Sequence, residues 1–96
     1  MAFHLTTKAK EDLKNIARYT QENWGKKQRN IYLKQIDDIF HLLSQGKQKG
    51  KIYDHIKKGY FKYNVGKHII FYRQFTKSEI QIVRILHQRM DAPNHI

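Results

Sequence analysis

The chain has 96 residues, with 19 lysines and arginines against 8 acidic residues, which gives a formal net charge of +11 at pH 7. This length fits a single domain over residues 1–96 and leaves no room for a second core. Because 40% of the residues are hydrophobic and 12% are aromatic, the composition excludes an intrinsically disordered polycation. The absence of cysteine excludes a disulfide scaffold, a thiol nucleophile and a cysteine-ligated metal centre.

The sequence also bears on location and on partners. No apolar run approaches the ~18 residues of a membrane span, and the opening MAFHLTTKAK lacks the apolar stretch of a secretory signal. We therefore expect a soluble, cytoplasmic protein with no membrane partner. The positive charge by itself suggests a polyanionic partner, which could be nucleic acid, an acidic protein or an anionic membrane surface. Most of the cations are lysine, which lacks the bidentate geometry of arginine. The charge therefore indicates a diffuse positive field rather than specific recognition of bases or phosphates.

The first predicted elements are a short strand and a helix. Phe3 and Leu5 alternate with polar neighbours, as a half-buried strand requires. Thr6 or Thr7 can cap a following helix. Apolar residues then recur at spacings of three and four as far as Trp24, which places them on one face of that helix.

A second helix is predicted over residues 26–44. Gly25 separates it from the first helix, because glycine readily adopts the left-handed conformation that ends helices, and Gly46 ends the second helix in the same way. With so short a link, the two helices should form an antiparallel hairpin.

The remainder of the chain predicts a loop and then a sheet. Residues 46–58 are rich in lysine and glycine, which indicates an exposed loop with a brief turn over 52–56. The hydrophobic period then changes to two and predicts strands over 61–65, 69–75 and 80–87, followed by a short polar tail. The fold class is therefore α+β, with an N-terminal strand, an antiparallel helical hairpin and a three-stranded antiparallel meander.

One helical hairpin covers only one face of such a sheet. The last two strands are apolar on both faces, so the other face, carrying either Ile70 and Tyr72 or Ile69 and Phe71, is expected to remain for solvent or a partner. An exposed apolar face on a small protein usually marks an interface. The pattern predicts an obligate partner or a homodimer.

The residues offer no metal, cofactor or nucleophilic site, and one catalytic alternative stays open. The 6 histidines are scattered without metal-ligand spacing, so no metal is expected. Cleavage of RNA through its own 2′-hydroxyl needs only a base, an acid and cations. The candidate groups for such a reaction are Tyr72, Arg73, Arg84 and His87. Strand parity places Tyr72 and Arg73 on opposite faces, so only one of them can face a common substrate.

Several ordered motifs resemble those of the ParE toxins in the RelE/ParE superfamily. Residues 65–73, VGKHIIFYR, resemble the signature VGxHxIFYR, and residues 82–91, IVRILHQRMD, resemble the family's closing segment. The helix opening over residues 5–13 and the Trp24-Gly25 pair resemble the family as well. The resemblance spans essentially the whole chain.

This resemblance implies a RelE/ParE-like fold and the toxin of a type II toxin–antitoxin module, which inhibits DNA gyrase, blocks replication and arrests growth, as in plasmid maintenance. It implies a ParD-like antitoxin that binds the toxin directly as a hetero-oligomer, and action without catalysis. RelE-type relatives instead cut mRNA on the ribosome, and a metal-independent endoribonuclease remains the alternative. The ParE-like ending leads us to expect contacts with gyrase or a gyrase–DNA complex from His87, Gln88, Arg89, Met90 and Asp91.

Antitoxin contacts are expected from aromatic and basic residues, since protein interfaces favour tyrosine, phenylalanine and arginine. The candidates are Tyr19, Tyr32, Tyr60, Phe61, Tyr63, Phe71 and Arg73. We interpret the net charge as complementary to an acidic, wrapping antitoxin and to a gyrase–DNA complex.

Overall fold

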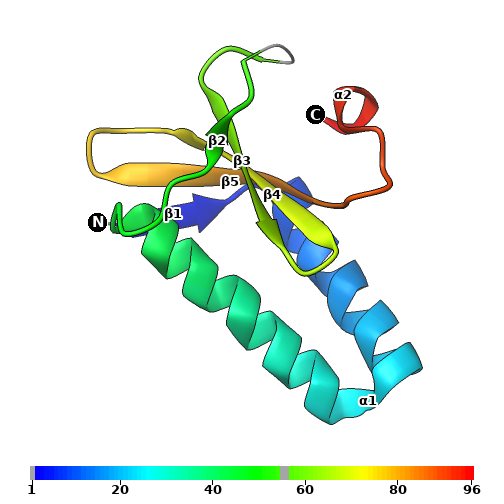
Figure 1. The fold of residues 1–96 in the computed structure, drawn as a ribbon. Helices are drawn as coiled ribbons and strands as arrows, with labels where there is room; N and C mark the ends of the chain where they lie inside the picture. The colour runs from blue at the N-terminus through cyan, green and yellow to red at the C-terminus, as the bar shows by residue number, and fades with distance from the viewer. Residues whose placement is uncertain (1, 55–56) are drawn as a thin grey trace.

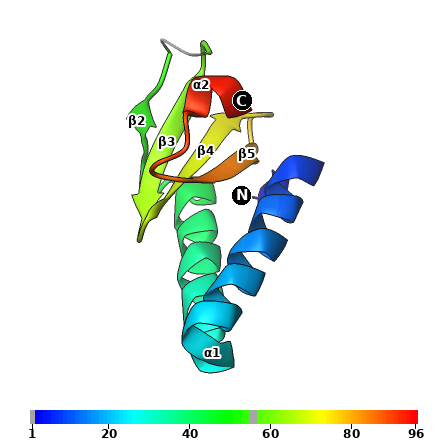
Figure 2. The same cartoon turned by 90° about the vertical axis from the view of Figure 1, so that its right-hand side faces the viewer.

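A five-stranded sheet in the order β1-β5-β4-β3-β2 forms the centre of the computed structural model, which describes residues 2–54 and 57–96. A long, bent helix packs on one face of the sheet and a short helix on the other (Figures 1 and 2). In the described part of the chain, no helix is both long and apolar enough to cross a membrane. The elements are β1 (Ala2–Leu5), α1 (Thr7–Ser44), β2 (Lys51–Ile52), β3 (Tyr60–Val65), β4 (His68–Gln74), β5 (Glu79–His87) and α2 (Ala92–His95).

The predicted helical hairpin is confirmed, and it is formed by α1. Gly25 breaks this helix with a φ of +91° and a ψ of 169°, and the two halves run antiparallel from that point (Figure 1). Thr6 caps the start, because its Oγ1 accepts a hydrogen bond from the Ala9 N–H at 3.1 Å. Gly46, with a φ of +73°, follows the end of the helix as the sequence predicts.

The predicted three-stranded meander corresponds to β3, β4 and β5, and the sheet extends beyond it on both sides. The N-terminal strand β1 pairs in parallel with β5, from Ala2 opposite Glu79 to Leu5 opposite Ile82. Residues 46–58 were expected to form a loop throughout. This expectation is wrong at β2, because Lys51 and Ile52 pair antiparallel with β3. The turn expected over 52–56 includes residues 55 and 56, which lie outside the described residues.

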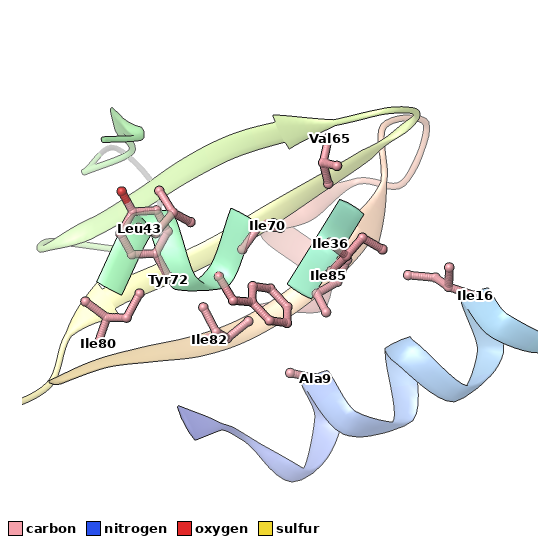
Figure 3. Close-up of a cluster of buried hydrophobic side chains, with 11 residues drawn as sticks. Ala9, Ile16, Ile36, Leu43, Val65, Ile70, Tyr72, Ile80, Ile82 and Ile85 are labelled. Carbon is pink, nitrogen blue, oxygen red and sulfur yellow. The ribbon is translucent and has the colours of Figure 1, made fainter. Parts of the chain in front are cut away.

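The main core lies between the hairpin and the sheet (Figure 3). Ile36 from α1, Ile70 from β4 and Ile82 from β5 are fully buried there. Burial of each such side chain contributes about 1.5–3 kcal/mol. This packing fixes which face of the sheet the hairpin covers: it is the face of Ile70 and Tyr72.

A β-bulge explains why residues of the same parity in β5 reach opposite faces of the sheet. Phe71 pairs with Arg84 while the next residue, Tyr72, pairs with Ile82, so Val83 is an extra residue in β5. The bulge shifts the alternation of side chains by one position. As a result, Ile82 packs with the hairpin, whereas Leu86 packs on the opposite face.

The prediction of an uncovered apolar sheet face is wrong. Phe71 and Leu86 lie on the face opposite the hairpin, and each is only 1% exposed. They pack with Tyr53 and with Ala92 of α2, the helix that lies over this part of the sheet in Figure 2. The residues expected to form a polar tail therefore fold back and complete a small second core, so the expectation that the chain has no room for one is wrong.

Candidate functional site

A pocket of about 520 Å³ opens between the helical hairpin and the neighbouring ends of β3, β4 and β5. We call it the aromatic–basic pocket. Both halves of α1 contribute to it, together with the β3–β4 turn and the residues where β5 ends. Within the described part of the chain, its lining contains no carboxylate. The lining residues are Tyr19, Thr20, Trp24, Gln28, Tyr32, Gly66, Lys67, His68, His87, Gln88 and Arg89.

Tyr32 is held in place at the sheet side of the pocket. Its hydroxyl lies 3.1 Å from the Val65 carbonyl oxygen and 2.6 Å from His68 Nδ1. Gly66 adopts a φ of +55° in the β3–β4 turn, and a Cβ there would lie 2.7 Å from the Tyr32 hydroxyl oxygen. Only glycine fits this turn without displacing the ring. Burial raises the pKa of Tyr32, so the hydroxyl keeps its proton at neutral pH.

Two histidines face each other across the strands beside Tyr32. His68 and His87 are paired between β4 and β5, and their rings meet edge to face with centroids 5.4 Å apart. Burial lowers the pKa of His68, and the nearby His87 lowers it further. The Arg89 N–H donates to His87 Nδ1 at 3.1 Å, so a neutral His87 carries its proton on Nε2. This arrangement makes His87 Nε2 a hydrogen-bond donor.

The rim of the pocket combines exposed aromatic rings with cations. Tyr19 is 64% exposed and Trp24 is 70% exposed, values far above those usual for large aromatic residues. Lys67 and Arg89 line the same pocket, and neither forms an ion pair with a carboxylate in residues 2–54 and 57–96. The cations are therefore available to an external anion.

The expected target-binding segment, residues 87–91, connects β5 to α2. It is anchored by hydrogen bonds from the Gln88 N–H to the Lys67 carbonyl at 2.9 Å and from the Met90 N–H to the His87 carbonyl at 2.9 Å. Its first three residues line the aromatic–basic pocket. Met90 and Asp91 line a second cavity of about 250 Å³ beside α2, and His87 and Gln88 border both cavities. The segment thus separates the two cavities.

The expected antitoxin-binding residues do not form one surface. Tyr19 and Tyr32 line the aromatic–basic pocket. Phe61 and Tyr63 pack on the hairpin face of the sheet, whereas Tyr60, Phe71 and Arg73 have the opposite parity. The assignment of Phe71 to a surface contact is corrected by its burial, because α2 and Tyr53 cover it.

The four candidate groups for RNA cleavage do not converge. Tyr72 and His87 share the hairpin face, but their register positions on β4 and β5 differ by four residues, which is about 13 Å along a strand. The Tyr72 hydroxyl accepts a hydrogen bond from the Gly50 N–H at 2.6 Å. Arg73 and Arg84 lie on the other side of the sheet by register.

Both arginines are engaged in structural contacts. The Arg73 Nε donates to Gln81 Oε1 at 2.8 Å. The Arg84 guanidinium binds the buried carboxylate of Asp12, and this hydrogen bond raises the pKa of Arg84. Among the described residues, no three histidine, aspartate or glutamate side chains gather to hold a metal ion.

The sequence predicted binding roles for five of the pocket residues but not for Trp24 or Lys67. The five are His87, Gln88 and Arg89 on the sheet side and Tyr19 and Tyr32 on the helices. Trp24 was assigned to the apolar face of the first helix, but the structure leaves it exposed at the hairpin bend. A signal was available in its position, because it is the last apolar residue before Gly25. The apolar stripe of the first half of α1 therefore extends beyond the residues that pack on the sheet.

The helical hairpin, the sheet order and the closing segment define a RelE/ParE-like α+β domain. The family model of the ParE toxin of type II toxin-antitoxin systems (parDE) matches residues 3–92. The chain therefore belongs to the ParE toxin family.

Individual relatives agree with this assignment over nearly their whole length. The chain is 33% identical to Toxin ParE1 of Mycobacterium tuberculosis over 92 residues, covering 96% of this chain and 94% of that protein. It is 29% identical to Toxin ParE1 of Caulobacter vibrioides over 94 residues, covering 98% of this chain and 96% of that protein. A solved structure described as the chromosomal ParDE TA system from P. aeruginosa shares the fold, with a TM-score of 0.76, 22% identity, and coverage of 91% of this chain and 95% of that one.

Proposed function

We propose that this ParE-family toxin inhibits DNA gyrase in the cytoplasm through residues 87–91 and so blocks DNA replication. It acts by binding rather than by catalysis, and a ParD-like antitoxin neutralises it by direct contact in a hetero-oligomer. Membership of the ParE toxin family supports the toxin role. The separation of Tyr72, Arg73, Arg84 and His87 favours a binding mechanism over RNA cleavage.

The observation that carries the proposal is the way residues 87–91 are presented. Hydrogen bonds to Lys67 and His87 hold the backbone of this segment, while Arg89 and Met90 remain exposed. A segment that is already ordered loses less conformational entropy when it binds a partner. Met90, which is 43% exposed, and Arg89, which has no ion pair among the described residues, are of the residue types enriched at interfaces.

The charge and the pocket support the antitoxin. A net charge of +11 favours an acidic partner. An acidic segment laid across the aromatic–basic pocket would meet Lys67 and Arg89 and would cover Tyr19. Such a position also hides residues 87–89, which would explain how one protein blocks the action of the other.

Supercoiling of relaxed plasmid by purified gyrase tests the gyrase proposal. Arg89→Ala and Met90→Ala should each raise the concentration of toxin needed for half inhibition by about tenfold, the size of effect typical of an interface hot spot. Lys77→Ala is the matched control, because Lys77 is exposed in the β4–β5 turn at the far end of the sheet, and it should leave inhibition unchanged. Equal inhibition by the wild type and the three variants would contradict the assignment of residues 87–91 to gyrase binding.

Point substitutions suit this test better than truncation. Removal of all residues after Leu86 would take Ala92 and Ile96 from the second core and would expose Phe71. A truncated protein could then lose activity by unfolding rather than by loss of contacts.

A further inference from the structure

The aromatic–basic pocket combines cations with exposed aromatic rings, and this combination indicates the kind of ligand that it binds. We propose that the pocket binds an unpaired nucleotide of a single-stranded nucleic acid, with the base stacked on the exposed ring of Tyr19 or Trp24 and the phosphate on Lys67 and Arg89. This activity is separate from gyrase inhibition, because it requires only the toxin and the strand. It is carried by the pocket's charge, its exposed rings and two exposed glutamine side-chain amides.

The charges of the pocket select an anion. Lys67 and Arg89 line it without carboxylate partners among the described residues, and its described lining contains no acidic side chain. His87 adds a donor at Nε2, since its Nδ1 accepts from the Arg89 N–H at 3.1 Å. Phosphate oxygens accept hydrogen bonds from all three groups.

The exposed rings select a flat partner. Tyr19 and Trp24 are 64% and 70% exposed, and both line the pocket. Single-stranded nucleic acids are commonly bound by grooves that combine cations with aromatic rings, on which bases stack. A cavity of about 520 Å³ also lies within the range of sites that take small ligands.

Two exposed side-chain amides at the pocket favour a base over the apolar side of an acidic peptide. The side-chain amides of Gln28 and Gln88 make no hydrogen bond within residues 2–54 and 57–96, and both line the pocket. An aliphatic side chain seated there would remove these amides from water without replacing their hydrogen bonds, which is costly. A base has both a flat face for Trp24 and a polar edge for the amides.

Trp24 provides a local probe, because it is the one tryptophan in the chain. The full-length toxin is titrated with an eight-nucleotide oligothymidylate, with a duplex of the same length and with poly-glutamate, while tryptophan fluorescence is recorded. We expect saturable quenching by the single strand and an affinity for the duplex about tenfold weaker, since stacked bases are not available to the rings. The affinity for the single strand should fall as salt rises.

Matched variants separate the site from the general positive charge. Arg89→Ala, Lys67→Ala and Tyr19→Ala should each weaken binding of the single strand by about tenfold, while Arg89→Lys should restore most of the loss. Lys77→Ala removes the same charge about 23 Å away along β4 and should weaken binding less than about twofold. Unchanged circular dichroism shows that each variant is folded.

Three results would overturn the proposal. They are no quenching by the single strand, equal loss of affinity in Lys77→Ala and Arg89→Ala, or tighter binding of poly-glutamate than of the oligonucleotide. The last result would make the pocket a site for an acidic protein. Because gyrase is absent from the titration, failure here leaves gyrase inhibition standing, and failure of gyrase inhibition leaves this binding standing.

Discussion

The Arg84 guanidinium and the Asp12 carboxylate form a two-point ion pair between β5 and α1, with Nε to Oδ2 at 2.8 Å and Nη2 to Oδ1 at 2.9 Å. Their side chains are only 14% and 11% exposed. Asp12 Oδ2 also accepts from the Ile85 N–H at 2.9 Å, and Arg84 Nη1 donates to the His95 carbonyl at 2.6 Å. The pair therefore joins the hairpin, the sheet and α2 at one point.

This geometry predicts that Asp12→Ala is strongly destabilising. The change leaves a largely buried guanidinium without its partner, and such losses cost about 3–5 kcal/mol. Urea denaturation followed by circular dichroism gives the change in the free energy of unfolding. Asp38→Ala is the control, since it breaks an exposed pair with Lys34 and should cost about 0.5 kcal/mol or less. Similar losses for the two variants would show that the Asp12 pair has no structural role.

Gly66→Ala should destabilise the protein more than Gly59→Ala. Both glycines have positive φ values, +55° and +85°, so both substitutions introduce backbone strain. A Cβ at Gly66 would also overlap the Tyr32 ring, whereas no atom of the described residues lies within 4 Å of a Cβ at Gly59. The overlap should add about 1–3 kcal/mol to the loss of unfolding free energy. Equal losses would indicate that Tyr32 moves freely and that the pocket wall is not fixed.

Acid should destabilise the folded protein through His68. Burial and His87 lower the pKa of His68 in the folded state below its ordinary value, while the smaller effect of Asp12 opposes this. As the pH falls below about 6.5, the unfolded chain takes up a proton that the folded state resists, so stability decreases until the folded pKa is passed. We expect His68→Gln to lose less unfolding free energy than the wild type between neutral pH and about pH 5. The same pH dependence in both proteins would contradict this assignment.

Removal of residues 92–96 should lower stability and expose apolar surface. Phe71 and Leu86 would lose their cover of Ala92 and Ile96, and Arg84 would lose the His95 carbonyl. We expect a loss of about 2 kcal/mol in unfolding free energy, together with increased binding of a hydrophobic dye. Asn94→Ala keeps the helix and alters only an exposed contact with Asp91, so it should behave like the wild type. Unchanged dye binding after the deletion would show that the second core does not depend on α2.

The parts of the fold that depend on local chemistry were predictable from the sequence. Gly25 and Gly46 gave the bend and the end of α1 because their effect on the backbone is local. The strand β2 has only two residues, and it depends on pairing with β3 rather than on a pattern of its own. The position of α2 depends on distant contacts, such as that of Ala92 with Phe71, and periodicity does not report these.

The candidate site was predictable from the sequence only in part, because only some of its residues lie in a continuous motif. The motif over residues 82–91 drew attention to His87 and Arg89 because it is continuous in sequence. Trp24 and Lys67 join them only when the hairpin and the β3–β4 turn fold together. The charge of Lys67 and the ring of Trp24 are visible in the sequence, but their proximity is a product of the tertiary structure.

Gyrase inhibition is the central claim, and a paired assay with the same purified toxin tests it most directly. One arm measures supercoiling of relaxed plasmid by gyrase, and the other measures cleavage of mRNA on translating ribosomes. The account predicts that supercoiling is lost at toxin concentrations that leave the mRNA intact. Cleaved mRNA with unaffected supercoiling would contradict it and would establish the endoribonuclease alternative.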